Sequence, residues 1–113
     1  MARTISRDEL RAAIDGSAVT VVDALPAAPY ANRHLPGAVN LTAEDPDERV
    51  IAVLPERAAA IAVYSTDAAC DRGPAFARRL DDLGYGDVRL YREGIEDWVG
   101  AGLPVAAEET KEA

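Results

Sequence analysis

The sequence of 113 residues contains a single cysteine, Cys70, and a single histidine, His34. One thiol cannot form a disulfide within the chain, and one thiol with one imidazole is too small a ligand set for a zinc site. We therefore expect neither a bound metal nor another cofactor.

Basic residues are also scarce, with 12 Lys and Arg against 20 Asp and Glu and a net charge of -8. Nucleic-acid binding depends on neutralising phosphates, so this balance argues against a nucleic-acid partner. It argues equally against an anionic membrane surface. No apolar run approaches the roughly 18 residues of a membrane span, and the amino-terminal segment lacks the apolar centre of a signal peptide. A cytoplasmic location is the resulting expectation.

Aromatic residues make up only 5% of the chain, so aliphatic side chains must build the core. The length suits one domain rather than two. We expect a single domain over residues 1–105, followed by an acidic, flexible tail over residues 106–113.

Strands and helices are predicted to alternate along the chain. Val19–Asp23 is a β-branched run and Ala60–Tyr64 a hydrophobic one, both without alternation, which is typical of strands buried on both faces. Ser6 with Glu9 has the spacing of a capping box at the start of a first helix. The other expected elements are strands at 4–5, 38–41 and 88–91, and helices near residue 30, over 46–54, over 74–83 and over 94–98. This order predicts an α/β fold, an open and mostly parallel sheet with helices on both faces.

Ligands of such sheets bind beyond the carboxyl ends of the strands. The polar loop from Ser65 to Gly73 follows a predicted buried strand and precedes a helix that we expect to begin near Pro74. Because this loop also carries Cys70, it is the most informative segment of the chain.

Three motifs occur in an order that resembles the rhodanese-like family. Val21-Val22-Asp23 is similar to the family's first long strand, and His34-Leu35-Pro36-Gly37-Ala38-Val39-Asn40 to its H-[IL]-P-G-A-x-N motif. Gly94-Ile95-Glu96-Asp97-Trp98, followed by Ala101-Gly102-Leu103-Pro104-Val105, is similar to its carboxyl-terminal motif. The resemblance covers residues 4–105.

The resemblance implies a possible sulfurtransferase. Active members carry a cysteine at the start of the loop after the fourth strand, and backbone amides of the loop cradle its persulfide. That cysteine takes sulfur from a donor such as thiosulfate and passes it to a thiol or to cyanide. Here the position holds Ser65, whose hydroxyl cannot form a persulfide, and the thiol lies five residues later at Cys70. Cys70 is therefore the candidate catalytic residue, and the candidate residues for binding a small sulfur-containing anion are Ser65, Thr66, Asp71, Arg72 and Gly73.

The loop contains features that favour a reactive Cys70 thiolate and features that oppose it. A following helix amino terminus and Arg72 favour a thiolate, whereas Asp67 and Asp71 are expected to raise the pKa of the thiol and to repel thiosulfate. Two functions stay open. One is a sulfurtransferase that works through a Cys70 persulfide, and the other is a catalytically inactive binding or regulatory module whose protein partner the sequence does not identify.

Other enzyme classes lack their required residues. A Cys-x5-Arg oxyanion loop is absent, because Phe76 stands six residues after Cys70 and Asp71 six after Ser65. A serine hydrolase would need a base, and His34 lies in a turn motif where a structural hydrogen bond is expected. The hydroxyl of Ser65 is expected to bond a backbone amide.

Overall fold

The computed structural model describes residues 3–107, in which five strands and five helices alternate. Their bounds are β1 (Arg3–Thr4), α1 (Arg7–Asp15), β2 (Thr20–Asp23), α2 (Ala27–Asn32), β3 (Val39–Asn40), α3 (Asp47–Val53), β4 (Ile61–Tyr64), α4 (Arg72–Asp82), β5 (Val88–Tyr91) and α5 (Gly94–Gly100). The strands form one sheet in the order β1-β5-β4-β2-β3, and all pairs are parallel. The predicted α/β fold with an open parallel sheet is confirmed.

The central strands are buried on both faces, as their runs without alternation predict. All four residues of β4 are buried. In the register of the sheet, Tyr64 lies beside Asp23 on β2 and beside Tyr91 on β5. The residues that end these three parallel strands therefore lie side by side at the carboxyl ends of the strands.

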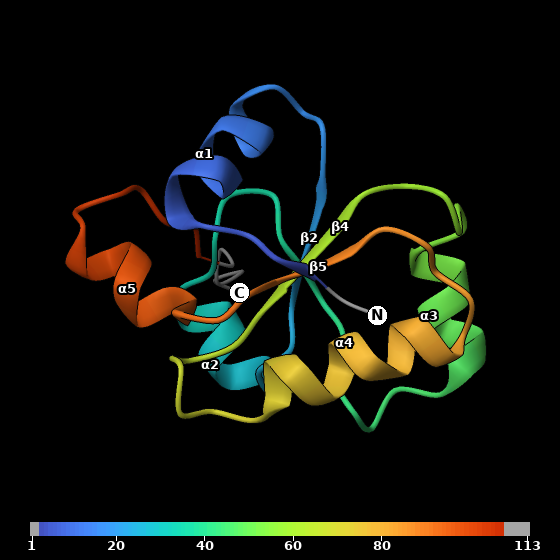
Figure 1. Cartoon of the computed structure of the whole chain (residues 1–113). Coiled ribbons are helices and arrows are strands. Elements are labelled where there is room, and N and C mark those ends of the chain that lie inside the picture. The colour runs from blue at the N-terminus through green and yellow to red at the C-terminus, as the bar shows by residue number, and fades with distance from the viewer. Residues whose placement is uncertain (1–2, 108–113) are drawn as a thin grey trace, which may run out of the picture.

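Helices cover both faces of the sheet (Figure 1). Side chains of α3 and α4 pack on one face, around Val50, Phe76 and Leu80. Side chains of α1 and α5 pack on the other, around Leu10 and Trp98. Trp98 is only 1% exposed, and its indole N–H donates to the carbonyl of Pro104 at 2.8 Å, so it fixes the end of the domain to the core.

The first helix confirms the capping box. Ser6 Oγ accepts from the Glu9 amide at 3.1 Å, and the Ser6 amide donates to the Glu9 carboxylate at 2.9 Å. This backbone bond and the Ser6 side chain lower the pKa of Glu9. The two bonds satisfy donors that a helix amino terminus leaves free.

Helix α4 begins at Arg72, two residues before the start predicted at Pro74. Its first turn closes because the Ala75 amide donates to the carbonyl of Asp71 at 3.0 Å. Proline is tolerated in this turn, since the amides of the first turn have no partner within the helix. Pro74 is thus the third helical residue rather than the first, and the helix terminus lies closer to Cys70 than expected.

The carboxyl-terminal segment returns to the domain. His34 and Ala106 exchange two backbone hydrogen bonds, of 2.9 and 2.8 Å. Ala106, the first residue of the expected tail, is therefore paired, while positions 108–113 of that tail lie outside the described residues. Between residues 3 and 107, no helix is both long enough and apolar enough to cross a bilayer.

Candidate functional site

The polar loop lies at a crossover of the sheet. After β2 the chain moves to the edge strand β3, and after β4 it moves the other way to β5. The carboxyl ends of adjacent strands whose connections leave in opposite directions form a crevice, which is the usual ligand site of open α/β sheets. Asp23 ends β2 and Ser65 directly follows β4, so the loop that carries Cys70 lies at this crevice.

The start of the loop is held by the amino terminus of α5. The amide of Ile95 donates to the Ser65 carbonyl at 3.0 Å, and the amide of Glu96 donates to the Thr66 carbonyl at 3.0 Å. These bonds fix two successive peptide groups of the loop.

Gly94 makes this contact possible. A Cβ at this position would lie 2.5 Å from the carbonyl carbon and oxygen of Thr66, and the φ of +71° disfavours a side chain. The C=O and N–H of a trans peptide point in opposite directions. Fixing the Ser65 carbonyl on α5 therefore directs the Thr66 N–H to the other side, where the Cys70 sulfur lies.

Polar groups surround the half-buried Cys70 thiol. Burial raises the pKa of this thiol, but hydrogen bonds outweigh burial and hold the pKa below its ordinary value. These bonds come from the hydroxyl of Ser65, the backbone of Thr66 and Arg72, and the side chain of Thr66. We call these groups the thiol cradle. Amides that hydrogen-bond to a charged sulfur favour the thiolate, which is the nucleophilic form.

Ser65 is part of the cradle and is itself held in place. It is 3% exposed, and its Oγ accepts a 3.1 Å hydrogen bond from the amide of Gly73. The expected hydroxyl–amide bond is thus present. A Cβ at position 73 would lie 2.9 Å from Ser65 Oγ, so glycine lets the first turn of α4 approach this hydroxyl.

The acidic residues of the loop do not act on the thiol as the sequence suggested. Neither Asp67 nor Asp71 is among the main causes of the shift in the pKa of Cys70, and that shift is downward. Asp67 instead closes a turn, in which its carboxylate accepts from the Ala69 amide at 3.1 Å and its carbonyl accepts from the Cys70 amide at 3.1 Å. The side chain of Asp71 is exposed and makes no capping bond to α4.

A buried polar network supports the crevice from below, and the sequence did not predict it. The Tyr64 hydroxyl donates to the Asp23 carboxylate at 2.6 Å and accepts from the Leu35 amide at 3.0 Å. Asp23 also accepts from the Leu25 amide at 2.8 Å, so it fixes the turn after β2. Burial raises the pKa of Asp23, although the bonds from Tyr64 and Leu25 oppose this rise.

His34 has the expected structural role. Its Nδ1 lies 2.8 Å from the carbonyl of Tyr30, and its ring stacks on the Tyr30 ring with centroids 4.1 Å apart. With its backbone paired to Ala106, the residue connects α2 to the end of the domain. Its side chain is not among the main groups that shift the pKa of Cys70.

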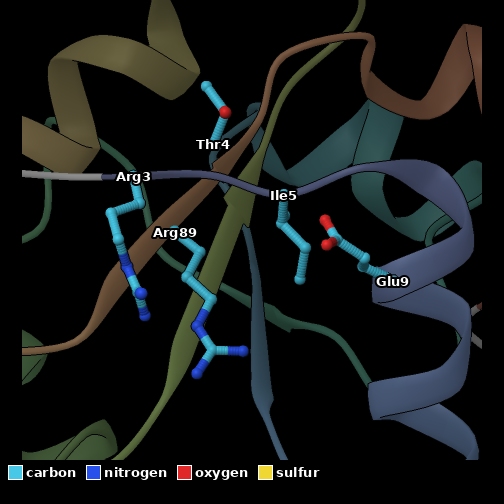
Figure 2. A pocket seen from close by; sticks show the side chains of 5 residues that line it. All are labelled: Arg3, Thr4, Ile5, Glu9 and Arg89. Carbon is cyan, nitrogen blue, oxygen red and sulfur yellow. The ribbon is translucent and has the colours of Figure 1, made fainter.

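A hollow of about 310 Å³ lies away from the thiol, at the β1 edge of the sheet. Figure 2 shows that it is lined by Arg3, Thr4, Ile5, Glu9 and Arg89. Both arginines pair with Asp87, at 3.0 Å from Arg3 and 2.9 Å from Arg89. The bonds from Arg89 lower the pKa of Asp87, so these charges are already matched within the fold.

Comparisons with known proteins agree with this geometry. The family model for the rhodanese-like domain matches residues 6–101. An HTH-type transcriptional regulator, Rv0324 of Mycobacterium tuberculosis, is 33% identical over 101 residues. The match covers 89% of this chain and 43% of the regulator, so the chain spans less than half of that relative.

Solved structures show the same fold. A thiosulfate sulfurtransferase from Pseudomonas aeruginosa superimposes with a TM-score of 0.83 at 29% identity, over 94% of this chain and 20% of that one. A rhodanese-related protein from Thermoplasma volcanium superimposes with a TM-score of 0.75 at 25% identity, over 94% of this chain and 99% of that one. The BH2092 protein from Bacillus halodurans gives 0.85 at 23% identity, over 94% and 77%, which shows the fold alone. From its sequence motifs, its parallel sheet and the family match, this chain belongs to the rhodanese-like domain family.

Proposed function

We propose that this domain is a sulfurtransferase that carries sulfane sulfur as a persulfide on Cys70. The observation that carries the proposal is the thiol cradle, whose hydrogen bonds from Ser65, Thr66 and Arg72 hold the pKa of Cys70 below its ordinary value, next to a Ser65 hydroxyl that the Gly73 amide holds at 3.1 Å. Like many ligand sites of open α/β sheets, it combines a helix amino terminus with a strand end.

Loading would proceed in one displacement. The Cys70 thiolate attacks the outer sulfur of thiosulfate, a new S–S bond forms, and the S–S bond of thiosulfate breaks. The electron pair of the broken bond leaves with sulfite, and Cys70 retains the transferred sulfur as a persulfide anion. A negative charge then develops one bond beyond Sγ, where backbone amides of the loop stabilise it.

Ser65 does not carry sulfur in this proposal. Its hydroxyl lacks the polarisable, easily ionised sulfur that the exchange requires. The proposed role of Ser65 is to donate a hydrogen bond to Cys70, because its own Oγ already accepts from the Gly73 amide.

Turnover with thiosulfate and cyanide tests this function. Sulfite and thiocyanate are expected as products, and both should disappear in the Cys70→Ser variant. In the Ser65→Cys variant the family's usual nucleophile returns while Cys70 is kept, and activity should rise if the loop retains its amides. Absence of turnover in the wild type with thiosulfate, with other sulfane donors and with thiol acceptors would overturn the proposal.

A regulatory module is the second candidate. The observation that favours it is the 33% identity to a protein described as an HTH-type transcriptional regulator, of which this chain spans only part. In this alternative the same domain would bind or sense a sulfur compound without turnover. A protein that accepts sulfur on Cys70 but passes it to no acceptor would support the alternative.

A further inference from the structure

A hollow of about 290 Å³ shares Arg72 with the thiol cradle. Its lining consists of Ala24, Ala43, Glu44, Asp71, Arg72 and Ala75. Ala24 follows β2, and Asp71 and Arg72 follow Cys70 in the chain, so the hollow occupies the crevice between the ends of β2 and β4. Its volume is at the lower end of the roughly 300–1,000 Å³ typical of small-molecule sites, which suits a small ligand.

The charges that line this hollow are unmatched. Within residues 3–107, the half-buried Arg72 guanidinium makes no ion pair, and neither does the Glu44 carboxylate. Asp71 makes no capping bond through its side chain. Other arginines that lie close to carboxylates do pair with them, such as Arg79 with Asp47 at 2.7 Å. Charged side chains of both signs that make no ion pair therefore line one cavity.

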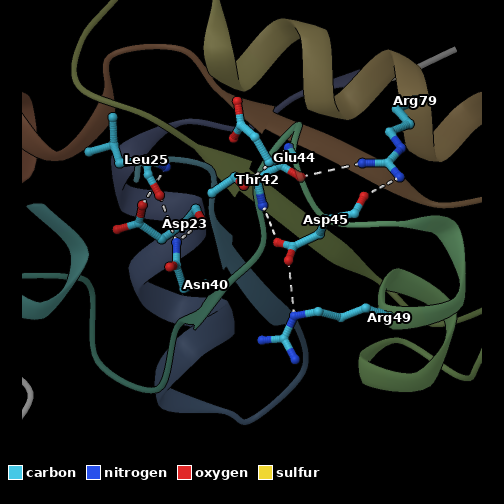
Figure 3. A network of polar contacts seen from close by, with 8 residues as sticks. All are labelled: Asp23, Leu25, Asn40, Thr42, Glu44, Asp45, Arg49 and Arg79. Carbon is cyan, nitrogen blue, oxygen red and sulfur yellow. Dashed lines mark hydrogen bonds and ion pairs between the residues drawn. The ribbon is translucent and has the colours of Figure 1, made fainter. Parts of the chain in front are cut away.

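The wall that carries Glu44 is held in position by α4. Arg79 donates to the carbonyls of Thr42 and Asp45, at 3.3 and 2.6 Å. The Asp45 carboxylate accepts from the Thr42 amide at 2.8 Å and pairs with Arg49 at 3.1 Å. Figure 3 shows this network around the short loop that presents Glu44. Because this loop is held in place before a ligand binds, less free energy is lost in ordering it on binding.

We propose that this hollow binds the sulfur acceptor, and that the acceptor is a small zwitterionic thiol of the amino-acid type. Arg72 would hold its carboxylate, while Glu44 and Asp71 would hold its ammonium group. The three alanines would contact its carbon chain. The inference rests on the proposed function, because it names the acceptor for the sulfur on Cys70.

The transfer step balances with these two reactants alone. The acceptor thiolate attacks the outer sulfur of the protonated Cys70 persulfide, and a new S–S bond forms on the acceptor. The bond between Cys70 Sγ and the outer sulfur breaks, and its electron pair remains on Sγ. The acceptor leaves as a persulfide with the proton of the outer sulfur, and Cys70 returns to a thiolate.

Binding can be tested without sulfur chemistry. The probe is S-methyl-L-cysteine, which has both charges but no thiol, titrated into isotope-labelled protein and followed by amide chemical shifts. The matched probes are its methyl ester, which lacks the carboxylate, and its N-acetyl derivative, which lacks the ammonium. We expect the zwitterion to bind about tenfold or more tightly than either, with shifts at Ala24, Ala43, Glu44, Arg72 and Ala75.

Two variants test the roles of the charges. In Arg72→Gln, which keeps the main-chain amide, the zwitterion should lose its advantage over the ester. In Glu44→Gln, it should lose much of its advantage over the N-acetyl derivative. Arg78→Gln and Glu48→Gln are matched controls on exposed positions and should leave all three affinities unchanged.

The outcomes separate this inference from the proposed function. Equal binding of the three probes, or shifts confined to other parts of the molecule, would overturn the inference even if Cys70 carries sulfur. Selective binding of the zwitterion without any sulfur on Cys70 would support the site and reject the sulfurtransferase.

Discussion

The amide of Gly73 donates a 3.1 Å hydrogen bond to Ser65 Oγ, and this bond turns the hydroxyl proton away from Gly73. Because the amide occupies one lone pair of the oxygen, the hydroxyl can donate its proton to the Cys70 sulfur. Burial raises the pKa of the thiol, and this hydrogen bond from Ser65 lowers it. Ser65 thus stabilises the thiolate of Cys70, which lies five residues after the position of the family's usual cysteine.

The Ser65→Ala variant should therefore have a higher Cys70 pKa. The thiolate is the species that reacts, so the rate of alkylation by iodoacetamide should follow a pH profile displaced to higher pH. The Gly73 amide also loses its partner, which should lower the free energy of unfolding by about 1–3 kcal/mol. An unshifted alkylation profile in a folded variant would contradict the role given to Ser65.

The Gly94→Ala variant should be strongly destabilised, because a Cβ would lie 2.5 Å from backbone atoms of Thr66 and the φ of +71° is unfavourable. We expect a loss of about 3 kcal/mol or more in urea unfolding. Gly102→Ala has a φ of +77° but no atom within 4 Å, and should cost only about 1–2 kcal/mol. Equal losses in the two variants would show that the close contact with Thr66 is unimportant.

The Tyr64→Phe variant should make stability more dependent on pH. Burial raises the pKa of Asp23, so the native carboxyl keeps its proton to higher pH than the unfolded one, and the associated stability is lost as pH rises through the native pKa. Losing the Tyr64 donor raises that pKa further. The variant should therefore lose more stability near neutral pH than in mildly acidic buffer.

Tyr85→Phe is the control for this comparison. The Tyr85 hydroxyl donates to the carbonyl of Leu54, so its removal affects no carboxylate. Its loss, of about 1–3 kcal/mol, should be the same in both buffers. If urea unfolding gave the same pH dependence for the two variants, the coupling between Tyr64 and Asp23 would be refuted.

The Arg79→Gln variant should loosen the loop that carries Glu44, because Arg79 bonds two carbonyls of that loop and Asp47. Hydrogen exchange of amides 42–47 should accelerate, while the exposed Arg78→Gln variant should leave it unchanged. Unchanged exchange in Arg79→Gln would mean that other contacts hold the loop.

Local signals in the sequence predicted most of the fold. The runs of β2 and β4 without alternation, and the Ser6–Glu9 capping box, depend on neighbouring residues and were confirmed. The start of α4 was misplaced, since proline is compatible with more than one position of a first turn.

Contacts between distant segments could not be predicted in the same way. The approach of Gly94 to Thr66 joins a strand end to a helix that begins after the next strand. The bond between Tyr64 and Asp23 depends on the register of two strands. The charges of Asp67 and Asp71 suggested a raised pKa for Cys70, because charge alone does not reveal that Asp67 is engaged in its own turn.

The intact mass of the protein after incubation with thiosulfate shows whether Cys70 carries sulfur. We expect the addition of one sulfur atom, localised to the peptide that contains Cys70, removed by cyanide and absent from Cys70→Ala. A wild-type protein whose mass stays unchanged with thiosulfate and with other sulfane donors would contradict this expectation.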